Sequence, residues 1–186
     1  MAASVPVVIA NDQIPVQVNV VSYSNVQALV AEYLKNGAAY NMRVNGSGTP
    51  QVFQYLCDAT KDIVVHELRF IFSCANFAWS GTGFGKSATV SLANGILLEL
   101  VVNNGFAITL NTIKINEDFL RTFGENPVTD SAGNSVVLVA SYRFGGTLLL
   151  KGGTSDKIKV TIRDDLTSGS LGVNYLSATV FGDKLA

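Results

Sequence analysis

The chain has 186 residues, with 13 Lys and Arg against 14 Asp and Glu and a net charge of −1. Charged residues make up 15% of the chain, well below the roughly 25% of an average globular domain, so much of the surface must be uncharged or apolar. The charge balance argues against a nucleic-acid-binding protein, which needs a basic patch, and no stretch approaches the roughly 18 apolar residues of a membrane span. We expect neither nucleic acid nor a membrane among its partners, and we expect other subunits to cover part of its surface.

Residues 1–22 are predicted to form an extended N-terminal arm in front of one β-sandwich domain, residues 23–186. The arm contains two β-rich runs, each interrupted by a proline that cannot donate to a β-ladder: Val5, Pro6, Val7, Val8 and Ile9, then Ile14, Pro15 and Val16. Such segments suit a sheet edge, either as the first strand of the domain's own sheet or as a strand added to a neighbouring subunit. The second interpretation makes these eight residues the partner-binding part of the chain.

A helix is predicted over residues 24–37. Ser24 and Gln27 form a capping box, apolar residues follow at helical spacing, and Gly37 suits the C-terminal end. The apolar stripe consists of Val26, Leu29, Val30, Tyr33 and Leu34. We expect this stripe to lie against a sheet or a neighbouring subunit.

The rest of the chain is predicted to be mainly β, because apolar and polar residues alternate with period 2. The predicted β-rich runs are Ala38–Val44, Asp62–Cys74, Ile96–Asn103, Phe106–Ile115, Ser135–Phe144, Thr147–Leu150, Lys157–Arg163 and Tyr175–Phe181. Asn104-Gly105 and Gly145-Gly146 suit hairpin turns, and Gly152-Gly153 begins the next return. A second short helix begins at Asn116. The pattern predicts an antiparallel β-sandwich or jelly roll with one or two short helices.

The glycine-rich segment Gly81–Ser87 looks like a phosphate-binding loop, but it is one residue too short for that motif. The residues after Lys86 also reach an Asn-Gly break instead of opening a helix, which a phosphate site needs. We interpret the segment as a flexible loop that presents Trp79 and Phe84 to a partner.

Residues that could carry catalysis or bind metal have ordinary structural explanations. The single histidine, His66, shares its predicted strand face with Leu68 and Phe70, so we expect a hydrogen-bonded core side chain. Cys57, His66 and Cys74 do not have the spacing of a zinc site. Asp164-Asp165 suits a turn, and the loop Asp130–Asn134 lacks the acidic spacing of a calcium site, although a weakly held interface cation stays an alternative. We therefore expect no catalytic residues, no cofactor and no metal.

Three segments resemble structural proteins of tailed bacteriophages. They are Val7–Val16 (VVIANDQIPV), Asn94–Leu97 (NGIL) after the glycine-rich loop, and Val160–Thr167 (VTIRDDLT). The resemblance implies a component of the virion, assembled in the host cytoplasm. From the arm, the low charge and the lack of catalytic residues, we expect the chain to bind copies of itself and other virion proteins, such as major capsid or tail subunits. We favour a capsid decoration protein, with a tail, neck or fibre-anchoring protein as the alternative.

Two other classes of function stay open. A carbohydrate-binding sandwich could use Trp79 and Phe84 as an aromatic platform. An enzyme would have to draw on His66, Asp164 and Asp165, which form no known catalytic motif.

Overall fold

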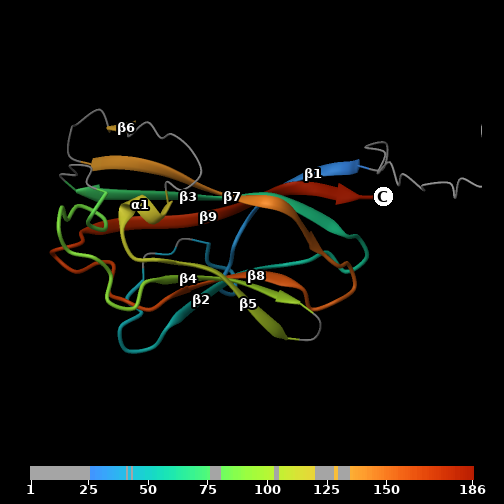
Figure 1. Ribbon diagram of the computed structural model, residues 1–186, viewed down its shortest axis with the longest axis horizontal. Coiled ribbons are helices and arrows are strands. Elements are labelled where there is room, and N and C mark those ends of the chain that lie inside the picture. Colours follow the sequence, from blue (N-terminus) through green and yellow to red (C-terminus); the bar gives the residue numbers. More distant parts are fainter. Residues whose placement is uncertain are drawn as a thin grey trace, which may run out of the picture.

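The computed structural model describes residues 26–40, 42, 44–75, 81–102, 105–119, 128–129 and 135–186; the predicted arm and Trp79 lie outside these ranges. Two antiparallel β-sheets pack face to face (Figure 1). In spatial order, the five-stranded sheet contains β1 (Val26–Tyr33), β9 (Val173–Leu185), β3 (Ile63–Ala75), β7 (Ser135–Leu150) and β6 (Val128–Thr129). The four-stranded sheet contains β2 (Gln51–Leu56), β8 (Lys157–Ile162), β4 (Ile96–Val102) and β5 (Phe106–Ile113). The predicted β-sandwich is confirmed.

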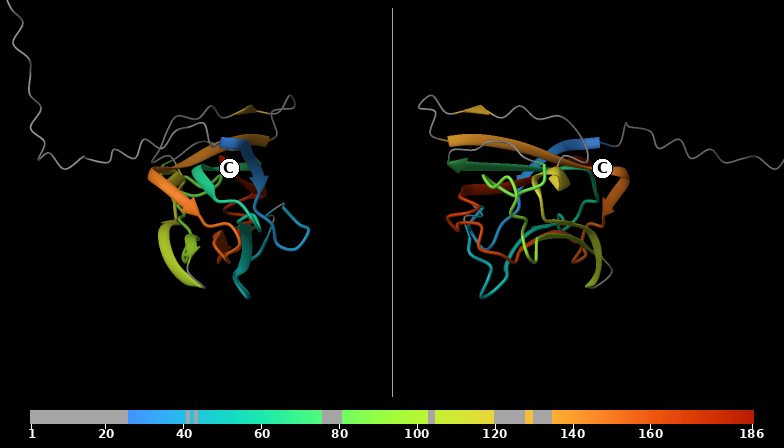
Figure 2. Two further views of the ribbon diagram at one scale, coloured as in Figure 1. Left: turned by 90° about the vertical axis from the view of Figure 1, so that its right-hand side faces the viewer. Right: turned by 60° about the vertical axis from the view of Figure 1, so that its left-hand side comes forward.

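The strand pairing is that of a jelly roll. Strands counted from the two ends of the chain pair with one another: β1 with β9, β2 with β8, β3 with β7, and β4 with β5. The result is one long antiparallel hairpin rolled up so that successive pairs alternate between the two sheets, and the two layers are visible end-on in Figure 2. This topology puts β1, β6, β2 and β5 at the outer edges of the described sheets.

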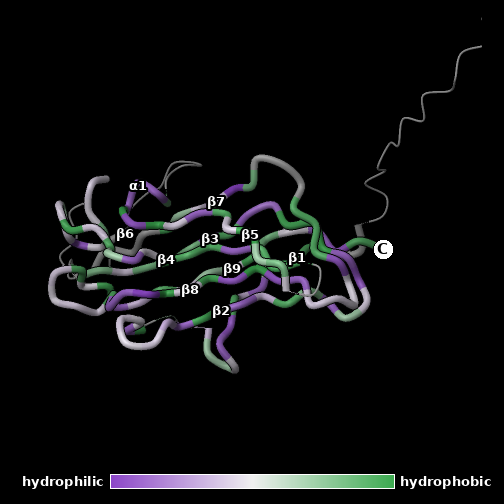
Figure 3. Tube along the Cα trace, turned by 60° about the horizontal axis from the view of Figure 1, so that its bottom comes forward, coloured by the Kyte–Doolittle hydropathy of each residue, from purple (hydrophilic) through white to green (hydrophobic). Residues whose placement is uncertain are grey.

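The core lies between the two sheets. Along β8, Ile158, Val160 and Ile162 are fully buried while Lys157 and Lys159 are partly exposed, as the alternation predicts. Figure 3 shows hydrophobic and hydrophilic positions mixed along the strands. The largest buried side chains are phenylalanines from both sheets and from the segments that close one end, namely Phe53, Phe70, Phe72, Phe84 and Phe119. One short helix, α1 (Asn116–Phe119), occurs in the described part and begins at the predicted residue. None of the described helices has the length and hydropathy to cross a membrane.

The helix predicted over residues 24–37 is wrong. Its described residues form β1, which pairs with β9 from Val26↔Leu185 to Tyr33↔Thr179. Leu29, placed on the buried stripe by helical spacing, is 83% exposed, whereas its neighbour Val30 is buried. Tertiary pairing overrides a local helical pattern here, because β9 offers a ladder of backbone partners from Ala28 to Tyr33.

A β-bulge in β3 explains two further differences from the sequence prediction. The register with both β7 and β9 shifts between Val65 and Glu67, so the inward face changes from Val65 to Leu68. His66, expected in the core, therefore lies at the exposed side of the bulge. On β7 the register jumps from Arg143 to Leu148 at the same place, and the strand continues through Gly145-Gly146 instead of turning there. Figure 1 shows β7 bending toward the second sheet.

The strand predicted over residues 38–44 is also wrong. Its described residues contain only an isolated bridge between Asn36 and Ala39, although Met42 is fully buried as the alternation suggested. The Met42 N–H donates to the carbonyl of Leu176 on β9. By contrast, the hairpin between β4 and β5 is confirmed, with Gly105 at a φ of 112°.

Gly46 and Gly48, two residues apart, test how closely the backbone packs against the end of β8. A Cβ on Gly46 would lie 2.2 Å from the carbonyl oxygen of Ile162, while a Cβ on Gly48 would meet nothing within 4 Å. We expect Gly46→Ala to lower the free energy of unfolding by about 1–3 kcal/mol, because backbone must move. Gly48→Ala should leave it unchanged or raise it by about 0.4–1 kcal/mol through the unfolded state. Urea denaturation of both variants measures the difference, and equal stabilities would contradict the close contact.

Candidate functional site

The glycine-rich loop is fastened to the protein through its own backbone. The N–H of Phe84 donates to Val90, that of Gly85 to the Asn116 side chain, that of Lys86 to Leu171, and that of Ser87 back to Phe84. Buried Asn116 also donates from its Nδ2 to the carbonyl of Gly85 at 3.1 Å. A phosphate-binding loop needs such N–H groups to point at the ligand. Here they are already used, so the arrangement gives the loop a structural role.

Phe84 corrects the prediction of a partner-facing loop. Its side chain is 1% exposed and packs beside Phe72 and Phe119, with ring centroids 6.1 and 5.9 Å away. The loop therefore carries an anchor into the core, and the aromatic platform expected of a carbohydrate-binding sandwich does not form around Phe84. Trp79, the other half of that prediction, lies outside the described residues.

The single histidine makes a hydrogen-bond contact with β9. Its Nε2 lies 2.6 Å from Oδ2 of Asp183, and the His66 side chain is 53% exposed. Both cysteines are buried, unlike His66. The Sγ of Cys57 lies 3.4 Å from the carbonyl oxygen of Leu150. Within the described ranges, no group of three or more His, Cys, Asp or Glu side chains is placed to hold a metal ion.

Asp164 and Asp165 act as turn residues, as predicted. The Asp164 carboxylate accepts hydrogen bonds from the backbone N–H of Asn94 and Gly95, the latter at 2.7 Å. Asp165 accepts from the N–H and the hydroxyl of Thr167. Each carboxylate thus holds a neighbouring loop in place.

Glu67 is the centre of a polar network on β3 and β7. It is buried and accepts hydrogen bonds from Arg69 at 2.9 Å and from Ser141 at 2.7 Å, with Arg143 at 3.5 Å. Burial alone would raise the pKa of Glu67, but the Ser141 hydroxyl and the Arg69 guanidinium hold that pKa below its usual value. Arg69 also lies over the ring of Phe181, 4.3 Å from its centroid. A fully bonded carboxylate of this kind fastens the strands together.

The outer strands expose large apolar side chains. On β1, Leu29 is 83% exposed; on β2, Leu56 is 54% exposed; and on β5, Phe106 is 66% exposed with Ile108 beside it. Neither β2 nor β5 contains a charged residue or a proline. Sequence alternation identified β5 as a strand, but only the topology shows that it is an outer one. These strands form the candidate docking surface of the described chain.

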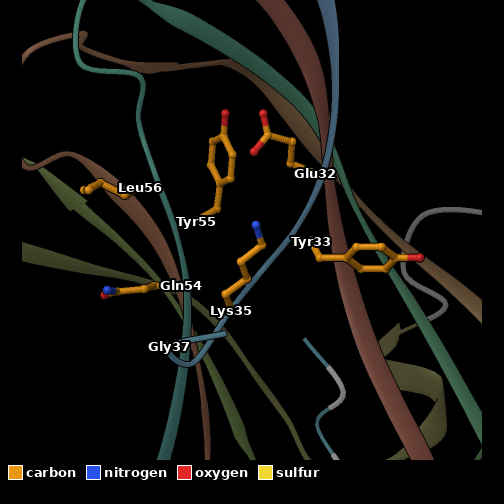
Figure 4. A pocket seen from close by; sticks show the side chains of 7 residues that line it. All are labelled: Glu32, Tyr33, Lys35, Gly37, Gln54, Tyr55 and Leu56. Carbon is orange, nitrogen blue, oxygen red and sulfur yellow. The ribbon is translucent and has the colours of Figure 1, made fainter. Parts of the chain in front are cut away.

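A polar cavity of 310 Å³ lies where the end of β1 approaches β2. Its lining residues are Glu32, Tyr33, Lys35, Gly37, Gln54, Tyr55 and Leu56. Figure 4 shows the Tyr55 ring, the Glu32 carboxyl group and the Lys35 side chain extending in a common direction, while the Tyr33 ring turns away from them. Sequence analysis missed this site, because its residues come from a segment predicted to be helical and from β2, which was not predicted as a strand.

Comparison with known proteins adds no further candidate. No protein-family model matches the chain, and no curated protein or solved structure matches it either. The docking surface and the cavity therefore have to be interpreted from their own residues.

Proposed function

We propose that this chain is a structural subunit of a bacteriophage virion, a capsid decoration protein that associates with copies of itself and with other virion subunits. The observation that carries the proposal is the outer strand β5, which exposes Phe106 and Ile108 and contains no charged residue or proline. Proteins that remain alone in solution protect such edges with lysine, proline or a covering segment. An unprotected edge is a template for a strand from another chain.

The surface chemistry supports an assembled role. Charged residues are 15% of the chain, and large apolar side chains are exposed on both sheets, with Leu29 on one and Phe106 on the other. Burying such side chains at an interface contributes roughly 25 cal/mol per Å² of apolar surface removed from water. A subunit held among neighbours on several sides would use these surfaces.

The jelly-roll topology agrees with this proposal by analogy. Jelly rolls recur in viral capsid domains, where closing two sheets on each other leaves loops and edges for contacts. The fold alone does not assign a function, so the assignment to a phage depends on the three sequence segments that resemble virion proteins. A tail, neck or fibre-anchoring subunit is the alternative, because it would use the same edges.

Imaging of the intact particle tests the proposal. Virions purified from the phage that encodes this chain should contain it, as measured by mass spectrometry, and cryo-electron microscopy should place it on the particle. A copy number that matches the capsid lattice supports decoration of the capsid. A copy number that matches the ring symmetry of the tail or neck selects the alternative, and absence from purified particles overturns both.

A further inference from the structure

The chain contains Asn-Gly dipeptides, in which an asparagine side chain can react with the backbone that follows it. They are Asn36-Gly37, Asn45-Gly46, Asn94-Gly95 and Asn104-Gly105. The glycine nitrogen attacks the side-chain carboxamide, ammonia leaves, and water opens the resulting succinimide ring to aspartate or isoaspartate. Glycine favours this attack because it has no Cβ in the way and its backbone turns freely. Asn104 lies outside the described residues, so the structure distinguishes among the other three dipeptides.

In two of these dipeptides the fold holds the attacking nitrogen in place. The N–H of Gly46 donates to the carbonyl of Asp164 at 3.0 Å, and the N–H of Gly95 donates to the Asp164 carboxylate at 2.7 Å. The Asn94 amide donates to that carboxylate as well, at 3.1 Å. Both glycines are buried, and an added Cβ would lie 2.2 Å from a backbone carbonyl oxygen at Gly46 and 2.8 Å at Gly95. These peptide groups cannot turn toward the asparagine carboxamide without local unfolding.

The third dipeptide is different, because the N–H of Gly37 has no hydrogen-bond partner among the described residues. Gly37 is exposed, lines the polar cavity beside β1, and has nothing within 4 Å of an added Cβ. Asn36 is exposed too, and two backbone hydrogen bonds with Ala39, of 2.8 and 3.0 Å, close the turn around Gly37 (Figure 4). Only the 3.0 Å bond, from the Ala39 N–H to the Asn36 carbonyl, has to open for the peptide group to turn, and solvent already reaches it.

We propose that Asn36 is a site of spontaneous deamidation, which reacts faster than Asn45 and Asn94 because the N–H of Gly37 is free. In the ring-forming step the Gly37 nitrogen loses its proton and bonds to Cγ of Asn36, while the bond from Cγ to the amide nitrogen breaks. Overall one water is consumed and one ammonia is released, so the reaction needs no oxidant, reductant or enzyme. Since the nitrogen must lose a proton, the reaction becomes faster as the pH rises. The inference is independent of the virion role.

Deamidation at this turn changes the connection between the two sheets. Next to the turn, Lys35 and Gln54 exchange two backbone hydrogen bonds of 2.9 and 2.8 Å, which join the end of β1 to β2. An aspartate at position 36 adds a negative charge beside Lys35 and takes the net charge from −1 to −2. An isoaspartate also adds a methylene group to the main chain, which disrupts the pairing of positions 36 and 39. The modification therefore alters the crossing between the sheets and leaves the core in place.

Peptide mapping by mass spectrometry tests the proposal on the full-length protein. The protein is incubated at physiological temperature, at neutral and at mildly alkaline pH, and the change from amide to acid is followed at each asparagine. We expect Asn36 to deamidate at least about tenfold faster than Asn45 or Asn94, since one hydrogen bond commonly changes an equilibrium by about that factor. The rate at Asn36 should be higher at the alkaline pH. Digestion in heavy-oxygen water identifies any deamidation that occurs during sample preparation.

Two variants separate the role of the glycine N–H from general exposure. Asp164→Ala frees the N–H of Gly95 but keeps the backbone carbonyl that holds Gly46, so it should raise the rate at Asn94 alone. Gly37→Ala should slow the reaction at Asn36 alone, because its Cβ hinders the attack. Thermal unfolding shows that each variant keeps the sandwich. The proposal is overturned if Asn45 or Asn94 reacts as fast as Asn36 in the parent, if folded Asp164→Ala leaves the rate at Asn94 unchanged, or if Gly37→Ala leaves that at Asn36 unchanged.

Discussion

Phe119→Ala is expected to lower the free energy of unfolding by about 3–5 kcal/mol, the usual cost of removing a buried aromatic side chain. Phe119 is 1% exposed and its ring centroid lies 5.2 Å from that of Phe70 and 5.3 Å from that of Phe72. It also packs against Phe84, so its loss opens a cavity among three other rings. Urea denaturation followed by circular dichroism measures the change.

Because of its position, removing Phe119 should destabilise the protein by more than the loss of its own ring contacts. Phe119 is the last residue of α1, and Asn116 at the start of α1 holds the glycine-rich loop through Gly83 and Gly85. When Phe119 is removed, the helix and the loop lose their shared anchor to β3. We therefore expect limited proteolysis at the glycine-rich loop to become faster in the same variant.

Phe106→Ala is the matched control, since it removes the same ring from an exposed position on an outer strand. It should change the free energy of unfolding by less than about 1 kcal/mol, the span of strand propensities. If Phe119→Ala and Phe106→Ala had similar effects on stability, the aromatic cluster would not be the organising part of this end of the core.

The double variant Phe106→Lys/Ile108→Lys is expected to weaken self-association by at least about tenfold, because interface anchors of this size commonly contribute 2 kcal/mol or more. Both side chains are exposed and lie two residues apart on one face of β5, opposite Val102 and Leu100 of β4. Two lysines would introduce the charges that outer strands normally use to prevent pairing. Sedimentation equilibrium over a range of protein concentrations measures the change.

Val90→Lys provides the control for the added charge, because Val90 is an exposed apolar residue in a loop and not on an outer strand. It should leave self-association unchanged, and all variants should keep the β-rich circular dichroism spectrum of the parent. A parent protein that stays monomeric at every concentration, or a double variant that associates as well as Val90→Lys, would remove β5 from the docking surface.

Several elements could be predicted because the deciding interactions are local. Along β8, alternation between lysine and apolar residues already separates the two faces, and both faces are confirmed. The return between β4 and β5 follows from Asn104-Gly105, whose residues tolerate the backbone of a tight turn. The start of α1 at Asn116 could likewise be predicted from the residues next to it.

The candidate sites could not be predicted, because they depend on neighbours far away in the chain. Glu32 and Lys35 meet Gln54 and Tyr55 only after β1 has paired with β9, some 150 residues later. A helical pattern at residues 26–34 gives no sign of that pairing. Likewise, the alternation of Phe106 and Ile108 does not say whether another strand covers β5; the sheet order decides that.

The sequence by itself determined that this protein is a β-sandwich with one short helix at Asn116, because strand periodicity and turn residues act over a few neighbouring positions. Only the tertiary structure decided that residues 26–33 form a strand, that His66 faces outward and that Phe84 faces inward. Those outcomes depend on the partner of each backbone segment. β9 supplies a ladder for β1, the paired strands β7 and β9 set the bulge after Val65, and Asn116 draws the glycine-rich loop onto the core.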